Sequence, residues 1–115
     1  MIEGFEKETS PLNDKELELI PVLVISFCRR VGKKRAIQSW QILRAFRNRG
    51  YKIDSARLRK MINHIRIHNM VPNLVSSNAG YWIEEDPYFV KKYIKTLISR
   101  SNAIRVVAIR LGRNL

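Results

Sequence analysis

Apolar residues recur at three- and four-residue intervals between residues 14 and 31, which is the spacing of one face of an α-helix. Asp14 is a capping residue at the start of this stretch, and Gly32 follows its end. Pro21 is expected either to kink the helix or to mark the first turn of its main portion. The preceding residues 1–13 lack such periodicity and are expected to form a flexible acidic tail. The side chains of the helix that are expected to face the core are Leu19, Leu23, Val24, Phe27, Cys28 and Val31.

Two further helices are expected, separated by a tight turn. Residues 33–37 are expected to form a minimal strand, and Ser39 is placed to cap a helix over residues 40–49. Gly50 is the expected left-handed residue that ends this helix. The next helix is expected over residues 55–69. The residues on its predicted core face are Leu58, Met61, Ile62 and Ile65.

A β-hairpin is expected after these helices. Residues 71–75 and 81–83 are rich in β-forming side chains, and residues 76–80 between them are mostly turn formers. The order helix, short strand, helix, turn, helix and hairpin is that of a winged helix-turn-helix domain. The sequence therefore predicts a mainly α fold with a small β-hairpin, and the winged domain is expected to cover residues 14–86.

The longest predicted element is a helix that begins after Asp86, has Pro87 in its first turn and runs to Leu111 before Gly112. Apolar residues recur along it at the heptad-like positions Val90, Ile94, Leu97, Ile104, Ala108 and Leu111. One small domain cannot bury all of this surface. Residues 87–115 are therefore expected to form a long C-terminal helix that builds a homodimer. The alternative is that this helix folds back over the first helix.

The chain is strongly basic, because 22 Lys and Arg residues against 10 Asp and Glu residues leave a formal net charge of +12. Self-repulsion destabilises a compact protein with this excess unless a polyanion binds it, so the expected partner is nucleic acid or an anionic membrane. The excess is concentrated between Arg29 and Arg66, where thirteen Lys and Arg residues accompany one acid, Asp54. The longest apolar stretch, residues 19–28, is too short to span a bilayer and follows an acidic segment. We therefore expect neither a membrane segment nor a signal peptide.

Cys28 is the only cysteine of the chain, which excludes an intramolecular disulfide and favours a cytoplasmic protein. Its place in an apolar run predicts a buried, unreactive thiol. His64 and His68 lie four residues apart on one helix, but no third ligand is close to them in the sequence, so neither a metal nor another cofactor is expected. The acidic residues 84–86 are interpreted as a helix cap. We expect no enzymatic activity, and no small-molecule ligand is evident.

Two segments carry a resemblance to a known family. Residues 55–62 read Ser-Ala-Arg-Leu-Arg-Lys-Met-Ile, and residues 71–83 read Val-Pro-Asn-Leu-Val-Ser-Ser-Asn-Ala-Gly-Tyr-Trp-Ile. They are similar to the recognition helix and the wing of the small winged helix-turn-helix domains of bacterial and phage repressors and prophage proteins. The resemblance covers residues 37–83 and implies sequence-specific binding of double-stranded DNA by a transcriptional or replication regulator of a phage or mobile element. By position, it implies DNA contacts from Ser55, Arg57, Arg59, Lys60 and Asn63, with Ser77 and Asn78 at the tip of the wing.

Charge and geometry suggest how these contacts would work. Arg59 and Lys60 can reach guanine acceptors or phosphates, and Asn63 can make a two-pronged contact with adenine, which discriminates by about 1 to 3 kcal/mol per good pair. Arg66 lies on one flank of the same helix and is also expected to contact DNA. Phosphate neutralisation is expected from Lys33, Lys34, Arg35, Arg44, Arg47 and Lys52.

Two other interpretations remain open. Tyr81 and Trp82 are interpreted as packing residues, and because no exposed aromatic platform is apparent, RNA or single-strand binding is the less favoured nucleic-acid function. The second interpretation is a protein-interaction module, in which the winged fold and the C-terminal helix dock onto an acidic partner.

Overall fold

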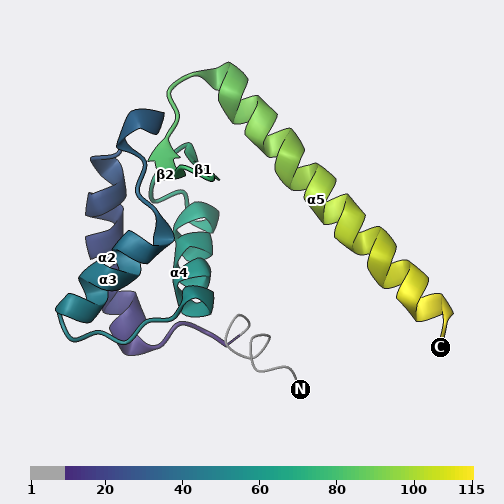
Figure 1. The fold of residues 1–115 in the computed structure, drawn as a ribbon, viewed down its shortest axis with the longest axis horizontal. Helices are drawn as coiled ribbons and strands as arrows, with labels where there is room; N and C mark the ends of the chain where they lie inside the picture. Colours follow the sequence, from purple (N-terminus) through teal and green to yellow (C-terminus); the bar gives the residue numbers. More distant parts are fainter. Residues whose placement is uncertain (1–9) are drawn as a thin grey trace. The chain divides into compact units, whose positions relative to one another are not determined.

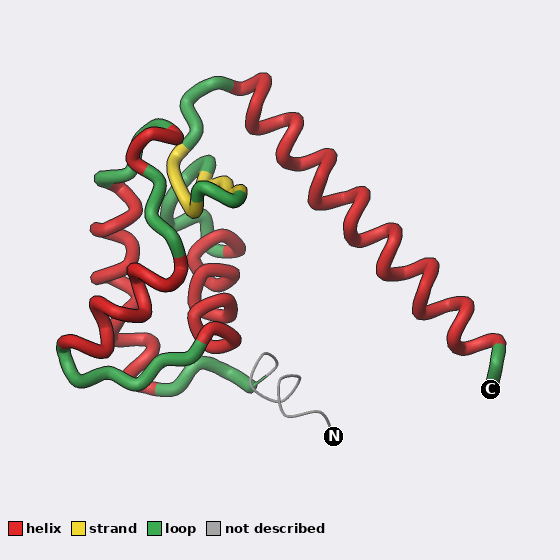
Figure 2. Tube along the Cα trace, in the orientation of Figure 1, coloured by secondary structure: helices red, strands yellow, loops and turns green. Residues whose placement is uncertain are grey.

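The computed structural model describes residues 10–115, and this part of the chain contains four α-helices and one β-hairpin. Figure 1 shows their arrangement. The described part of the chain divides into two compact units, with the boundary between Glu84 and Glu85. The elements are α2 (Asp14–Cys28), the short 3-10 helix η1 (Lys33–Arg35), α3 (Ser39–Asn48), α4 (Ser55–Ile67), β1 (Leu74–Ser77), β2 (Gly80–Ile83) and α5 (Pro87–Arg113). The prediction of a mainly helical chain with a small hairpin and a long C-terminal helix is confirmed (Figure 2).

Helix α2 begins with a reciprocal cap between Asn13 and Glu16. The Asn13 side chain accepts from the Glu16 amide at 2.8 Å, and the Glu16 carboxylate accepts from the Asn13 amide at 2.9 Å. The sequence had suggested Asp14 as the capping residue, but the residue that caps the helix is Asn13. Leu12 packs against the core, so residues 10–13 are part of the first unit, whereas the rest of the expected acidic tail lies outside the described residues.

The end of α2 differs from the prediction. The helix ends at Cys28, because the backbone beyond it pairs with β2: the Ile83 amide donates to the Arg30 carbonyl at 2.7 Å, and the Gly32 amide donates to the Ile83 carbonyl at 2.9 Å. Val31 is 38% exposed, and the Cys28 thiol is exposed. The expectation of a buried thiol was wrong, because the core face of α2 is centred on a stripe that lies about 120° around the helix from Cys28. The buried residues of that stripe are Glu16, Leu19, Ile20, Leu23 and Phe27.

The segment predicted as a strand over residues 33–37 forms η1 instead. Gly32 has a φ of +88°, which turns the chain into this short helix. Within residues 33–37, only Ile37 pairs with the hairpin, through hydrogen bonds of 2.9 Å and 2.8 Å with Tyr81. The hairpin itself is antiparallel, with Leu74 opposite Ile83 and Ser77 opposite Gly80.

The core of the first unit lies where α2, α3, α4 and the hairpin meet. Phe27, Met61 and Ile65 have no exposed surface, and Ile42 and Phe46 of α3 are also buried. Helix α3 begins at Ser39, because the amide of Gln38 donates to the Gln41 side chain at 2.9 Å and makes Gln38 the capping residue. Trp82 is also buried, and its ring nitrogen donates to Glu84 at 3.2 Å, which agrees with its interpretation as a packing residue.

Helix α5 forms the second unit. Asp86 caps it as predicted, through a 2.9 Å bond from the Tyr88 amide, and the helix continues through Gly112 to Arg113. None of its residues is buried. Among the described residues, no helix combines the length and the apolar character needed to cross a membrane.

Gly80→Ala tests the close approach between the hairpin and Ile37. Gly80 has a φ of +113°, and a Cβ there would overlap the Ile37 carbonyl. We expect this substitution to lower the free energy of unfolding by roughly 3 kcal/mol, measured by chemical denaturation. Gly50→Ala is the matched control, because Gly50 has a similar left-handed φ of +87° with no atom within 4 Å, and its cost is about 1 kcal/mol. Equal losses in the two variants would contradict the contact.

Candidate nucleic-acid interface

Helix α4 has a buried side and an exposed side. Leu58, Met61, Ile62 and Ile65 are at most 1% exposed, as the sequence predicted. Every fourth residue on the other side is exposed, and these residues are Ser55, Arg59, Asn63 and Ile67. This set is called the α4 ridge below. Lys60 is half-buried beside the ridge, and Ile67 is 79% exposed at its end. The ridge therefore presents a hydroxyl, a guanidinium and an amide outward from a rigidly packed helix.

The guanidinium of Arg57 is engaged inside the protein. It forms bonds of 2.6 Å and 2.7 Å with the Glu16 carboxylate, and it donates to the carbonyls of Ser10 and Pro11 at 2.9 Å each. Glu16 is 1% exposed, and the hydrogen bonds from Arg57 lower the pKa of its carboxyl below the ordinary value despite the burial. Arg57, which the resemblance placed among the DNA contacts, thus fastens the amino end of α4 to α2 and to residues 10–11.

Arg66 holds the other end of α4 in a similar way. Its Nε donates to the Leu74 carbonyl at 3.1 Å, and its Nη2 lies 3.5 Å from the Ser76 hydroxyl. The guanidinium carbon lies 5.5 Å from the centre of the Tyr81 ring, which is a cation–π distance. Arg66 was expected on the DNA-facing flank, and the structure places its guanidinium between α4 and the hairpin. This side chain therefore helps to hold the hairpin in its position relative to the α4 ridge.

A hollow of about 410 Å³ lies between the amino ends of α3 and α4 and the turn of the hairpin. Three residues predicted as DNA contacts line this hollow together, namely Ser55, Ser77 and Asn78. The Ser77 hydroxyl accepts from the Ala79 amide at 3.1 Å, which shapes the turn. Other polar residues that line the hollow include Ser39 and Ser76. The structure thus brings the start of α4 and the tip of the hairpin to one polar concavity.

Trp40 is a residue of this hollow that the sequence analysis missed. Its side chain is 57% exposed, and its ring nitrogen donates to the Gln38 side chain at 3.1 Å. No exposed aromatic platform was expected, and Trp40 exposes a single aromatic ring here, because it lies on the side of α3 opposite the buried Ile42 and Phe46. The signal for this was present in the sequence, since Trp40 falls outside the apolar stripe of α3.

The other predicted cations are exposed and spread over several elements. Lys33, Lys34 and Arg35 belong to η1, Arg44 to the outer side of α3, and Lys52 to the connection between α3 and α4. The Lys33 ammonium lies 5.9 Å from the centre of the Trp82 ring. Arg35 borders a different groove, between α2 and α3, and is not part of the hollow at the hairpin.

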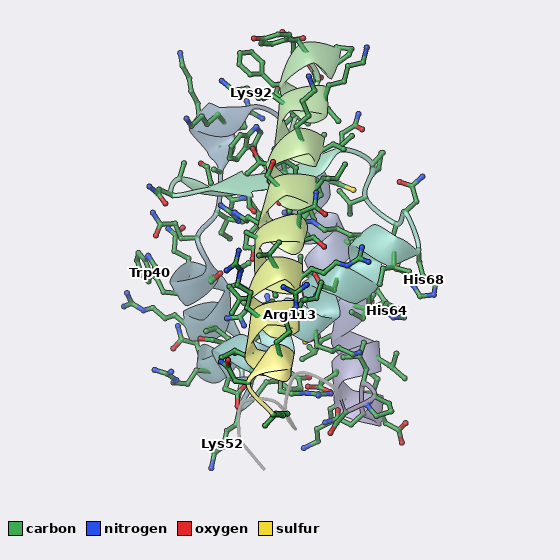
Figure 3. All side chains as sticks on the ribbon, turned by 90° about the vertical axis from the view of Figure 1, so that its right-hand side faces the viewer. Trp40, Lys52, His64, His68, Lys92 and Arg113 are labelled. Atoms are coloured by element: carbon green, nitrogen blue, oxygen red, sulfur yellow. The ribbon has the colours of Figure 1, made fainter. Side chains whose placement is uncertain are left out.

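His64 and His68 stack with their ring centres 4.2 Å apart, and Nδ1 of His68 lies 2.9 Å from the His64 carbonyl oxygen. Figure 3 shows them at the edge of the first unit opposite Trp40. Among residues 10–115, no group of three potential metal ligands comes together. The pair is therefore explained by ring stacking at the end of α4.

The Glu16–Arg57 pair predicts a specific dependence of stability on pH. A carboxyl whose pKa is lowered by folding stabilises the protein above its unfolded pKa and loses this contribution as the pH falls through its folded pKa. We expect Glu16→Gln to be less stable at neutral pH by about 3 kcal/mol, since Arg57 keeps a partly buried charge without its partner. The difference should shrink between about pH 5 and about pH 2, measured by urea unfolding.

Asp14→Asn is the matched control for this experiment. Asp14 is an exposed acid in the first turn of the same helix and has no ion pair with α4. Its removal should leave the pH dependence of unfolding close to that of the unmodified protein. If Glu16→Gln and Asp14→Asn show the same dependence, Arg57 does not hold α4 in the way described.

Comparison with known proteins gives no relative from which a function of this interface could be transferred. No protein-family model, curated protein or solved structure matches the chain. What the interface binds is therefore inferred from the α4 ridge, the hollow at the hairpin and the charges around them.

Proposed function

We propose that residues 14–86 form a winged helix-turn-helix domain that binds double-stranded DNA, with α4 in the major groove and the β1–β2 hairpin as the wing. The observation that carries this proposal is the α4 ridge: Arg59 and Asn63 are exposed on a helix whose opposite side is fully buried. Arginine and asparagine are the side chains that read guanine and adenine edges through paired hydrogen bonds. The strongly basic surroundings supply the sequence-independent attraction to phosphates.

The contacts of Arg57 and Arg66 at the two ends of α4 support this proposal. Arg57 ties its amino end to α2, and Arg66 ties the helix to the hairpin. A base contact requires a side chain within hydrogen-bond distance of the base edge. A helix that is already fixed in position before binding loses less conformational entropy when DNA binds. We accordingly assign structural roles to Arg57 and Arg66 and keep Arg59, Lys60 and Asn63 as the DNA contacts of α4.

The hollow at the hairpin is suited to the DNA backbone. The amino ends of α3 and α4 border it, and helix amino ends favour phosphate groups. Ser55, Ser77 and Asn78 supply hydrogen-bonding groups there. The exposed Lys33, Lys34, Arg44 and Lys52 are assigned to phosphate neutralisation beyond the hollow. A regulatory role in transcription or replication, of the kind found in phages and mobile elements, follows from the resemblance described above and belongs to the same proposal.

The DNA-binding experiment is selection from a random duplex library, followed by fluorescence anisotropy titration of the selected duplex. We expect Arg59→Ala to weaken binding about tenfold and to reduce the slope of log affinity against log salt by about 1. Asn63→Ala should reduce the preference for the selected base over its competitors by about 1 to 3 kcal/mol. Lys15→Ala is the control for removal of one positive charge, because Lys15 is an exposed α2 residue outside the interface. Absence of binding at low salt would exclude the proposal.

We further propose that α5 pairs with α5 of a second copy. None of its 27 residues is buried, and its large exposed apolar side chains include Ile94, Leu97, Ile104 and Leu111 at heptad spacing. Ser101 occupies the polar position within this repeat. Residues 87–113 also carry seven Lys and Arg residues and no acid, so two such helices repel each other at low salt.

The dimer is therefore expected to tighten as salt increases, which is the opposite of the effect of salt on DNA binding. Sedimentation equilibrium at about 50 mM and about 500 mM salt measures this difference. Ser101→Leu should strengthen the dimer at least about tenfold, because two more leucine side chains are buried. Ser99→Leu is the matched control, since Ser99 lies on the opposite side of α5 and should change association little. A monomer under all of these conditions, with Ser101→Leu included, would exclude the dimer.

A protein-interaction module is the second candidate function, and the charge of α5 is the observation that favours it. Residues 87–113 combine exposed apolar side chains with seven cations and no acid. This helix therefore matches a partner surface that is both acidic and apolar. NMR shift mapping separates the two functions, because DNA should perturb residues 55–66 and an acidic protein partner should perturb residues 87–113.

A further inference from the structure

A second concave surface of the first unit lies between α2 and α3. This groove has a volume of about 620 Å³ and shares no lining residue with the hollow at the hairpin. Its volume is in the range of roughly 300 to 1,000 Å³ that is typical of small-molecule sites. It is formed entirely by residues 22–49, within the first unit.

The floor of the groove is apolar. Leu23, Ile42 and Phe46 line it from the core and are at most 4% exposed. Val22 and Ile25 form its α2 side and are 38% and 57% exposed, so apolar surface remains in contact with solvent there. A ligand with an apolar body would remove this surface from water, which is favourable in proportion to the area covered.

The polar residues that border the groove are mainly arginines. Arg29, Arg30, Arg35 and Arg49 line it, and none of its described lining residues is acidic. Arg30 is held in place in part by a 3.4 Å hydrogen bond from its Nη1 to the Arg35 carbonyl. Four cations around one apolar surface repel each other, and a bound anion relieves this repulsion. Guanidinium groups are also the side chains best suited to pair with a carboxylate.

We propose that this groove binds a small amphiphilic anion, namely a carboxylate that carries an alkyl or aryl body. The apolar body would lie on the floor formed by Leu23, Ile42 and Phe46, and the carboxylate would lie among the arginines. Helix α5 of a second copy is a poor occupant, because it brings seven further cations and no acid to the same place. DNA is also a poor occupant, because a duplex bound to these arginines would leave the apolar floor facing water. The site is thus separate from the proposed DNA interface.

Octanoate is the probe for this site, and an NMR titration of the full chain measures its affinity. We expect saturable shifts of amides in residues 22–30 and 42–49. Octan-1-ol and octylammonium have the same alkyl chain without the negative charge, and each should bind at least about tenfold more weakly. Equal affinities for octanoate and octan-1-ol would overturn the recognition of an anion.

Two variants test the location of the site. Arg29→Gln combined with Arg49→Gln should weaken octanoate binding at least about tenfold, whereas Arg47→Gln removes a charge from α3 outside the groove and should leave the affinity unchanged. Ala45→Trp fills the groove from an exposed position, so the fold should tolerate it while octanoate binding is lost. Thermal unfolding verifies that each variant is folded.

The remaining outcomes also decide the proposal. Octanoate binding that persists in folded Ala45→Trp would place the site elsewhere and overturn it. An acidic amphipathic peptide that binds this groove while octanoate does not would replace the small ligand with a protein partner. Arg59→Ala should bind octanoate as the unmodified protein does, so failure of the DNA interface and failure of this site are distinguishable.

Discussion

The buried side of α4 is the constraint on which the rest of the first unit depends. Leu58, Met61, Ile62 and Ile65 are at most 1% exposed, and burial of each such side chain contributes about 1.5 to 3 kcal/mol. Rotation of α4 by one residue would expose some of them and bury Arg59, at a cost comparable with the total stability of a small domain, which is about 5 to 15 kcal/mol. The aliphatic side therefore determines which polar residues face outward. Arg57 and Arg66 then fix the helix along its length.

Elements whose stability is local could be predicted from the sequence, and those that depend on distant partners could not. The core face of α4, the left-handed Gly50 and the cap at Asp86 follow from patterns within a few residues, and all three are present. The end of α2 and the formation of η1 depend on pairing with Ile83 and Tyr81, about 50 residues further along the chain, a pairing that local periodicity does not encode. The same pairing leaves Val31 outside the core.

The candidate interface shows the same division. The predicted core face of α4 leaves Arg59 and Asn63 on the opposite side of the helix, and they are exposed. Arg57 and Arg66 were also expected to contact DNA, but they lie on the flanks between these two sides, and their long side chains reach Glu16 and Leu74, which are 41 and 8 residues away in the sequence. A flank position is compatible with either a structural or an external contact, and only the fold decides between them. Trp40 was missed because the predicted helix was judged by its apolar stripe, and an aromatic residue outside that stripe was not considered as exposed surface.

The basic charge of the chain has different consequences in different surroundings. The buried Glu16 carboxylate next to Arg57 turns that side chain into a contact within the protein. A carbonyl and an aromatic ring next to Arg66 make it a connection to the hairpin. Arg29 and Arg49 border apolar side chains, which favours an anion with an apolar body, whereas Arg59 lies beside Asn63 on an exposed ridge, which favours a hydrogen-bonding groove. Net charge therefore predicts the sign of a partner, and the atoms next to each guanidinium determine its class.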